Sequence, residues 1–505
     1  MTIQKPSPKK SIEIAAIATA TTIFCIFQAV GVGLPIIERI IASIALIWFA
    51  RYYKIVAIAI FIVFVVPLFY LPAGFEYGAP TSGYIAAVFE TNPNETAEFL
   101  SILPIRNFFY PAALLAVLAY ALFWRRLYPP PPPPNGQVSG HAKTAALIVI
   151  IITLFFSSIP YRFYRAIYKS YVAYADLIAK AEATPIKKYE IIKRADAANK
   201  DIRIVVIGES VRKDYLSVYG YPHQTTPFLD NANGVFIDKM IAAGPSTMAS
   251  LSRMLTAKEN GQIDWSRTIV TLGSQIGYET YWISNSGFAG KTATAVSLIA
   301  SRSDRSIFLN TAGSVNSGAV DDFAALGKFD EILQTPAQTP KLVFIHMAGS
   351  HSEACNRLYG FPNRFNLPYG EEHNCYLATI DKLDSFIKAL IDQTKRQKLS
   401  WSLIYFSDHG QEHYGDKKQI GLRHGGRAKQ SYEVPLFLLD DNATEHIVIK
   451  RQISGLHLID LVASWLGAET DRTDSRYTFT DFLEDSAIDT SNGAFDNLKD
   501  DPALY

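Results

Sequence analysis

The segment IRIVVIGES, residues 202–210, is a short apolar run that ends abruptly in a glycine, a carboxylate and a hydroxyl. Three later segments repeat this pattern: YWISNSG at 281–287, LVFIHMAGSH at 342–351 and LIYFSDHG at 403–410. Apolar runs with little polar alternation, separated by helix-length stretches, are typical of parallel strands that helices cover on both faces. The sequence therefore predicts an α/β domain over residues 201–480, with a mostly parallel sheet covered by helices.

Side chains suited to metal binding follow these strands. Glu209 comes directly after the first strand, and Asp408 and His409 come directly after the last. In open parallel sheets, ligands bind beyond the carboxyl ends of the strands, so we expect these side chains to lie close together. Carboxylate and imidazole groups suit zinc or manganese, and this small set leaves coordination positions open, as a catalytic site requires.

A candidate nucleophile lies in GPSTMAS, residues 244–250, which precedes a helical stretch. A hydroxyl at a helix N-terminus lies where backbone N–H groups and the helix dipole favour a phosphate. The same residues also suit a simple Ser/Thr helix cap, which is the commoner role. A bound metal favours the nucleophile, because it lowers the pKa of a hydroxyl.

The first 160 residues have a different character, because long apolar runs dominate them. They predict a transmembrane domain over residues 1–160 with five spans, at 14–37, 40–50, 55–75, 107–124 and 144–161. Basic residues before the first span and between later pairs of spans place the N-terminus in the cytoplasm, so everything after Tyr161 is expected outside. Tyrosines at helical spacing predict an interfacial linker helix over 161–200, and residues 481–505 form a C-terminal tail.

The overall charge and the cysteine content exclude two classes of protein. The formal net charge is +1, whereas a nucleic-acid-binding protein would show a basic excess. Three cysteines are too few for a disulfide scaffold and too scattered for a cysteine-based zinc site.

Several motifs in register resemble the membrane-bound phosphoethanolamine transferases of Gram-negative bacteria. They are GESVRKD at 208–214, YGY at 219–221, TTP at 225–227, GPSTMAS at 244–250, GSH at 349–351, SDHG at 407–410 and HG at 424–425. The resemblance covers essentially the whole chain and implies five spans before an alkaline-phosphatase-like domain.

The resemblance also implies roles for individual residues. It assigns a catalytic Zn²⁺, with Mn²⁺ as the alternative, to Glu209, the nucleophile Thr247, Asp408 and His409. It implies that substrate and phosphoryl contacts come from His351, His424 and Asn285, with His346 a weaker candidate, and from Glu95 and Glu98 in an outer loop near the lipid donor. Cys355 and Cys375 are expected to form one bridge outside the cytoplasm, where disulfides persist.

The implied reaction moves phosphoethanolamine from phosphatidylethanolamine to a lipopolysaccharide core, lipid A or periplasmic glucan, through a phosphothreonine intermediate. The implied location is the bacterial inner membrane, with the catalytic domain in the periplasm. Two alternatives stay open: a phosphoglycerol transferase of the lipoteichoic-acid synthase type, and a catalytically silent membrane scaffold. A sulfatase is disfavoured, because the Cys/Ser-x-Pro-x-Arg context that forms its formylglycine is missing around Ser246.

Overall fold

The computed structural model describes most of the chain and divides it into two compact units, Met1–Ala175 and Asp176–Tyr505. The described residues are 8–29, 37–50, 54–81, 84–85, 88, 93–101, 103–127, 152, 155–156, 158–194, 200–285, 294–309, 320–336, 339–416, 418–490 and 493–505.

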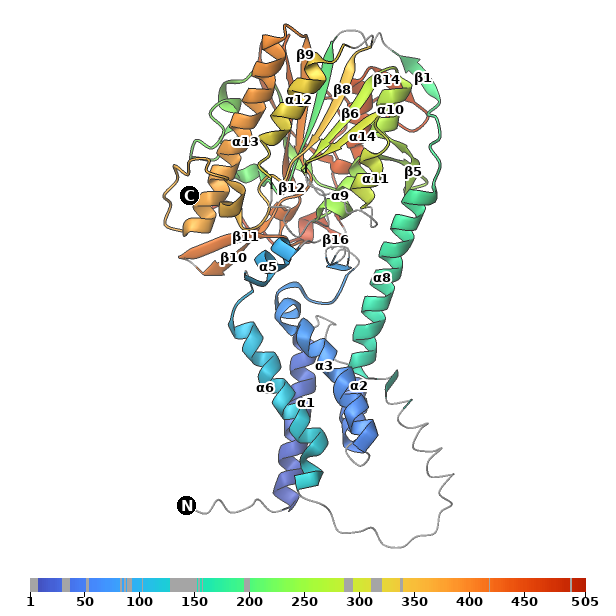
Figure 1. The fold of residues 1–505 in the computed structure, drawn as a ribbon, viewed down its shortest axis with the longest axis vertical. Helices are drawn as coiled ribbons and strands as arrows, with labels where there is room; N and C mark the ends of the chain where they lie inside the picture. Colours follow the sequence, from blue (N-terminus) through green and yellow to red (C-terminus); the bar gives the residue numbers. More distant parts are fainter. Residues whose placement is uncertain are drawn as a thin grey trace. The chain divides into compact units, whose positions relative to one another are not determined.

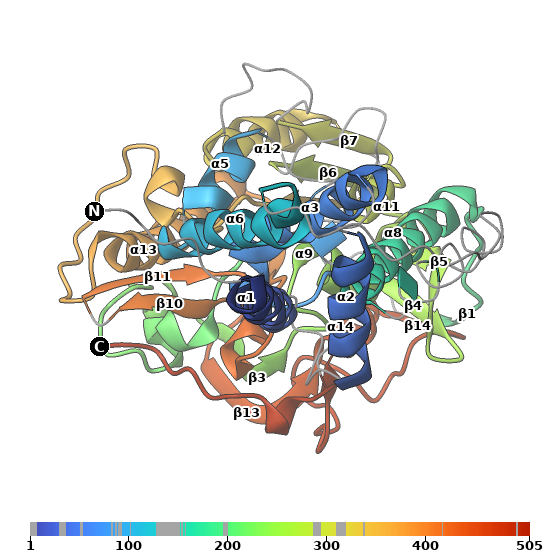
Figure 2. The same ribbon diagram turned by 90° about the horizontal axis from the view of Figure 1, so that it is seen from below.

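The first unit is helical in its described part. Its longer helices pack on one another in Figures 1 and 2: α1 (Pro8–Ala29), α2 (Ile37–Ala50), α3 (Lys54–Tyr77) and α6 (Arg106–Leu127), with the shorter α5 (Pro93–Ser101) before α6. Leu46, Phe64 and Leu118 are buried between these helices. Among the described residues, two helical segments are long and apolar enough to cross a membrane, Lys54–Tyr77 and Arg106–Phe123. Most of the fifth predicted span, 144–161, lies outside the described residues, so five spans stay a prediction.

Helix α8 (Ile159–Ala183) covers only the first part of the segment for which the sequence predicted a linker helix. The helix ends two residues before Pro185, and a residue that precedes proline is disfavoured in the α conformation. Further along, β1 (Ile191–Arg194) pairs antiparallel with β14 (Ala468–Thr470). The end of this segment is therefore part of the second unit's fold.

Within the described residues, eight strands form the main sheet of the second unit. Their order is β13 (His446–Ser454), β3 (Gly234–Ile241), β12 (Glu433–Asp440), β9 (Trp401–Ser407), β2 (Ile202–Gly208), β8 (Lys341–His346), β6 (Glu279–Ser284) and β7 (Arg305–Phe308). Strand β12 runs antiparallel to both of its neighbours, and the other described pairs in this sheet are parallel. Figure 2 shows β13 and β7 on opposite sides of the unit, as expected for the two edges. The predicted mostly parallel sheet is confirmed.

Helices cover both faces of this sheet (Figure 1). One face carries α12 (Ala324–Gln334) and α13 (Glu371–Arg396), and the other carries α9 (Thr247–Met254), α10 (Ile269–Gln275), α11 (Ala295–Ala300) and α14 (Leu458–Trp465). Ile204 and Val206 of β2 lie in the core beneath α13, and the alternate residues Val205 and Ile207 are equally buried. Each such side chain contributes about 1.5–3 kcal/mol on burial, which explains the continuous apolar runs.

The segment after residue 480, for which the sequence predicted a C-terminal tail, is folded onto the second unit. Phe482, Ile488 and Phe495 are buried. Asp501 accepts a hydrogen bond from the fully buried guanidinium of Arg212 at 3.2 Å, and the Leu504 amide donates to the Tyr215 hydroxyl at 3.1 Å. Much of this docking is polar, so the segment carries no long apolar run that would have revealed it.

A disulfide joins Cys355 to Cys375, which links the loop after β8 to the first turns of α13. Replacing both cysteines by serine should lower the free energy of unfolding by about 3 kcal/mol, because the bridge spans 20 residues and restricts the unfolded chain. Urea unfolding of the two proteins measures the difference. Thiol labelling of the unreduced, denatured protein should modify Cys25 only; labelling of Cys355 and Cys375 would contradict the bridge.

Candidate active site

The register of the central strands brings the predicted carboxylates together. Strands β2 and β9 are parallel neighbours in which Gly208 pairs with Ser407. Glu209 follows Gly208 and Asp408 follows Ser407, so the two acidic residues come at corresponding positions. The Asp408 amide donates to the Gly208 carbonyl at 3.0 Å, and the Asp408 carboxylate accepts from the Ser210 amide at 3.0 Å. Both acidic side chains are buried at this edge of the sheet.

Thr247 lies at the same edge of the sheet, on a helix that follows a different strand. It is the first residue of α9, which begins shortly after β3, and Ser246 before it is in the extended conformation of a helix cap. The Thr247 hydroxyl donates to Glu209 Oε2 at 2.9 Å, and its oxygen lies 3.5 Å from His409 Nε2. The residues that the sequence placed at the metal therefore form one contiguous group.

The hydrogen bonds of His409 fix which of its nitrogens faces this group. Its Nδ1 lies 2.7 Å from the Gly410 carbonyl oxygen, which can only accept, so Nδ1 carries a hydrogen. The other nitrogen, Nε2, lies 3.3 Å from Glu209 Oε1 and 3.3 Å from Asp408 Oδ2. Backbone anchoring of one ring nitrogen while the other faces the site is the usual arrangement of a metal-binding histidine.

The charges of this group are strongly coupled. Burial lowers the pKa of His409, but the carboxylates of Asp408 and Glu209 outweigh burial and raise it to about 9. Burial and the neighbouring Glu209 charge raise the pKa of Asp408. Burial also opposes ionisation of Glu209, but its hydrogen bond to His409 and the nearby histidine charges hold the pKa of Glu209 well below its usual value. Buried carboxylates this close together need a positive charge between them.

The donor atoms fit a divalent cation in that position. Ligand atoms of Glu209, His409 and His424 all lie within 4.8 Å of one another. Asp408 Oδ2 is buried and accepts no hydrogen bond from the described residues. One or two carboxylates with two imidazoles form a donor set typical of zinc. His424 follows the β10–β11 hairpin (Glu412–Asp416 and Gln419–Arg423), so no strand end of the main sheet marked it as a candidate ligand.

His351 completes this edge of the site. It lies on the loop after β8, and its Nε2 is 2.9 Å from His424 Nε2. The Ser350 amide of this loop donates to the Glu209 carbonyl at 2.9 Å. Gly349 has a φ of +53°, and a Cβ there would lie 2.7 Å from the Glu209 carbonyl oxygen. The loop approaches Glu209 this closely only because residue 349 has no side chain.

The remaining candidates have different surroundings. Asn285 follows β6 and uses both amide hydrogens within the protein, donating to the Val320 carbonyl and to Asp322, each at 2.8 Å. His346 is buried, and burial lowers its pKa to about 4, so it is neutral near pH 7. Glu95 and Glu98 lie on α5 in the first unit, and their side chains are outside the described residues.

Substitution of His424 tests the ligand set without any assay of activity. His424→Ala should weaken Zn²⁺ binding by more than the roughly 10- to 100-fold that indirect changes around a metal cost. His346→Gln is the matched control, because this buried histidine is not one of the clustered residues Glu209, His409 and His424. The Zn²⁺ affinity of this variant should stay close to that of the unchanged protein. Competition titration with a chelator measures both. Equal affinities for the two variants would remove His424 from the ligand set.

Comparison with known proteins identifies relatives of this chain. The model of the sulfatase family matches residues 202–468. The chain is 34% identical over 392 residues to a putative phosphoethanolamine transferase of Haemophilus influenzae, covering 70% of this chain and 73% of that one. It is 27% identical over 428 residues to the phosphoethanolamine transferase OpgE of Escherichia coli, covering 81% and 80%.

Solved structures show the same fold. The lipooligosaccharide phosphoethanolamine transferase EptA of Neisseria meningitidis, an integral membrane protein, aligns with a TM-score of 0.60 at 17% identity, over 92% of this chain and 97% of that one. The zinc complex of the periplasmic domain of Escherichia coli EptC aligns with a TM-score of 0.53 at 24% identity, over 63% and 98%. These likenesses support a helical region followed by an alkaline-phosphatase-like domain. Because the sulfatase model spans more than half of the chain and the Haemophilus relative matches most of it, the chain belongs to the phosphoethanolamine transferases of the sulfatase family.

Proposed function

We propose that the protein transfers phosphoethanolamine from phosphatidylethanolamine to a cell-envelope glycan, in two steps that share a phosphothreonine at residue 247. The observation that carries this proposal is the hydrogen bond from the Thr247 hydroxyl to Glu209 Oε2, at 2.9 Å. It holds a hydroxyl at a helix N-terminus, against a carboxylate whose pKa is low enough for it to stay ionised. The Thr247 hydrogen is thereby directed to Glu209, which leaves the lone pairs of the oxygen available to attack a bound phosphorus.

In the first step, the Thr247 oxygen gives up its proton and forms a bond to phosphorus, while the bond from phosphorus to the diacylglycerol oxygen breaks and that oxygen takes up a proton. In the second step, an acceptor oxygen gives up its proton and forms a bond to the same phosphorus, while the bond from phosphorus to the Thr247 oxygen breaks and Thr247 regains a proton. The first backbone N–H groups of α9 are free of intrahelical partners and suit the phosphoryl oxygens of both states. His351, whose Nε2 is 2.9 Å from His424 Nε2, lies where it can donate a hydrogen bond to the phosphoryl group.

We propose zinc as the cofactor, held by Glu209, Asp408 and His409 with Thr247, and with His424 as a further ligand. A bound zinc ion would lower the pKa of the Thr247 hydroxyl and draw charge from the phosphoryl oxygens. The share of imidazole donors in the site favours zinc over manganese, which prefers oxygen ligands. The zinc complex of the EptC domain supports this choice.

A lipid donor explains why the protein has a helical first unit with segments long enough to cross a membrane. Two of its described helical segments are long and apolar enough to span a bilayer, which supports a multi-pass protein of the bacterial inner membrane. The disulfide in the second unit supports a periplasmic position, because disulfides persist outside the cytoplasm. For the acceptor, we propose lipopolysaccharide, in its core or lipid A, or a periplasmic glucan; the lipooligosaccharide named for EptA is one such glycan.

Mass spectrometry of lipopolysaccharide and periplasmic glucans, from cells with and without the protein, tests the transfer. An added phosphoethanolamine is expected with the unchanged protein. It should be absent with Thr247→Ala, which lacks the attacking oxygen, and present with Ser246→Ala, whose side chain makes no cap hydrogen bond. An added phosphoglycerol would instead indicate the lipoteichoic-acid synthase type. No modification of either glycan would contradict the proposed transfer.

Metal removal tests the cofactor. Dialysis against a chelator should stop transfer, and Zn²⁺ should restore it, because the proposed reaction needs the metal to lower the pKa of the Thr247 hydroxyl. The thermal unfolding transition should persist, since the parallel sheet already holds Glu209 beside Asp408 through backbone pairing. Transfer that continues after the metal has been removed, as shown by elemental analysis, would contradict a metal-dependent mechanism.

A further inference from the structure

The loop Met347–His351 follows β8 and ends at His351, so its position decides where His351 lies relative to His424. Its first residue is fixed to the sheet, because the Met347 amide donates to the Ile207 carbonyl at 3.0 Å. Ser350 Oγ accepts a hydrogen bond from Thr379 Oγ1 of α13 at 2.8 Å. The turn between these points, Ala348 and Gly349, needs a separate anchor.

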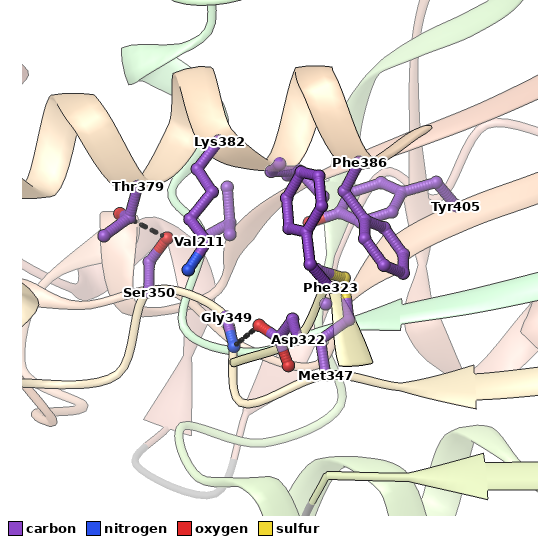
Figure 3. Close-up of a pocket in the computed structure, with 12 residues that line it drawn as sticks. Val211, Asp322, Phe323, Met347, Gly349, Ser350, Thr379, Lys382, Phe386 and Tyr405 are labelled. Carbon is purple, nitrogen blue, oxygen red and sulfur yellow. Dashed lines mark hydrogen bonds between the residues drawn. The ribbon is translucent and has the colours of Figure 1, made fainter. Parts of the chain in front are cut away.

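Asp322 supplies that anchor. Its Oδ1 accepts from the Ala348 amide at 2.8 Å, and its Oδ2 accepts from the Gly349 amide at 2.9 Å. Figure 3 shows the Asp322 carboxylate facing Gly349, beside the Ser350–Thr379 hydrogen bond. Oδ1 also accepts from the Asn285 amide at 2.8 Å. One buried carboxylate therefore ties together the loops that follow β6 and β8.

Opposing effects act on the pKa of Asp322. Burial raises its pKa, while the donors from Asn285, Ala348 and Gly349 and the charge of Lys382 act in the opposite direction. Lys382 of α13 is 2.8 Å from Asp321 and donates to the carbonyls of Arg357 and Leu358, beyond His351. Through Lys382, helix α13 thus contacts both the segment that carries Asp322 and the chain that follows the Met347–His351 loop.

We propose that Asp322 is a positioning residue for the transfer: it fixes the Ala348–Gly349 turn so that His351 lies against His424. It acts through the backbone of this loop. The inference rests on the proposed function, in which His351 serves the phosphoryl group. Displacement of such a group by about 1 Å can cost on the order of 100-fold in rate.

Asp322→Asn is the primary variant, because it keeps the size of the side chain but loses one acceptor. Whichever way the amide turns, its NH₂ group faces one of the two backbone N–H groups, and that hydrogen bond is lost. We expect kcat to fall by roughly 10- to 100-fold, as for other residues that orient a catalytic group, with KM for the lipid little changed.

Asp321→Asn is the matched control. It removes the same charge from the same lysine but leaves both acceptors of the turn in place, since Asp321 contacts Lys382 and the Phe323 amide. Its kcat should stay within about 2-fold of the unchanged protein, well below the 10- to 100-fold cost of losing an orienting contact. A loss of activity as large as that of Asp322→Asn would attribute the effect to charge and overturn the proposal.

A double-mutant cycle with His351→Ala separates positioning from general destabilisation. If Asp322 acts through His351, adding Asp322→Asn to His351→Ala should lower kcat no further. An equal loss in both backgrounds would mean that Asp322 only stabilises the fold, and the proposal would be wrong. If Asp322→Asn does not fold, Asp322→Glu keeps the charge and both oxygens, shifts them by one methylene and serves in the same cycle.

Amide hydrogen exchange of residues 347–351 in the full chain makes the result independent of the transfer assay. Faster exchange in Asp322→Asn, with the sheet strands unchanged, is expected. If the unchanged protein transferred nothing while this exchange still increased, the proposed function would fail and the anchoring of the loop would stand. If transfer occurred and neither kcat nor exchange responded to Asp322→Asn, the positioning role alone would be overturned.

Discussion

Two buried carboxylates face one imidazole nitrogen at the end of the central strands, with Nε2 of His409 3.3 Å from Glu209 and 3.3 Å from Asp408. Such a group is costly to bury without a cation, because neither carboxylate keeps its hydration. The parallel pairing of β2 with β9 enforces this closeness, since the two acidic residues follow paired positions. The backbone hydrogen bonds of the sheet thus provide the framework, and the geometry of the proposed metal site follows from strand register.

Elements outside the central pair then complete the site by close backbone approach. Gly349 lets the loop after β8 lie against the Glu209 backbone. Gly208 serves a similar purpose inside the unit, because a Cβ there would overlap the Tyr405 hydroxyl. Helix α13 contributes from behind: the Tyr376 hydroxyl accepts from the Arg212 amide at 2.9 Å and donates to the Ser210 carbonyl at 3.0 Å. These contacts keep the two loops that carry Glu209 and His351 in a fixed relation.

The sequence alone predicts the part of this site that depends on strand register. Glu209, Asp408 and His409 directly follow apolar runs, and parallel strands end at one edge, so their meeting follows from the pattern. Thr247 is different, because a hydroxyl at a helix start is usually a cap, and only the resemblance to a family singled out Thr247 among the hydroxyls of residues 244–250. The contact of His424 with His351 depends on a hairpin whose path the pattern does not determine.

Other features escape sequence reasoning because they are tertiary and polar. Asp322 stands before a helix as many capping aspartates do, and nothing in its neighbours reveals that it accepts from a turn after another strand. The docking of the last residues on Arg212 and Tyr215 is likewise invisible in an apolar pattern. Pro185 did mark a local boundary, since the linker helix ends just before it, but the pairing of β1 with β14 is a long-range event.

We propose that zinc binds at the edge of the sheet where β2 and β9 end, and that Thr247 is the nucleophile there. Anomalous diffraction at the zinc absorption edge, on crystals of the full chain, tests this proposal most directly. An anomalous peak is expected about 2.0–2.2 Å from oxygens of Glu209 and Asp408, from His409 Nε2, from the Thr247 oxygen and from a ring nitrogen of His424. A zinc peak bound elsewhere on the chain, with this edge lacking metal in a preparation that retains activity, would contradict it.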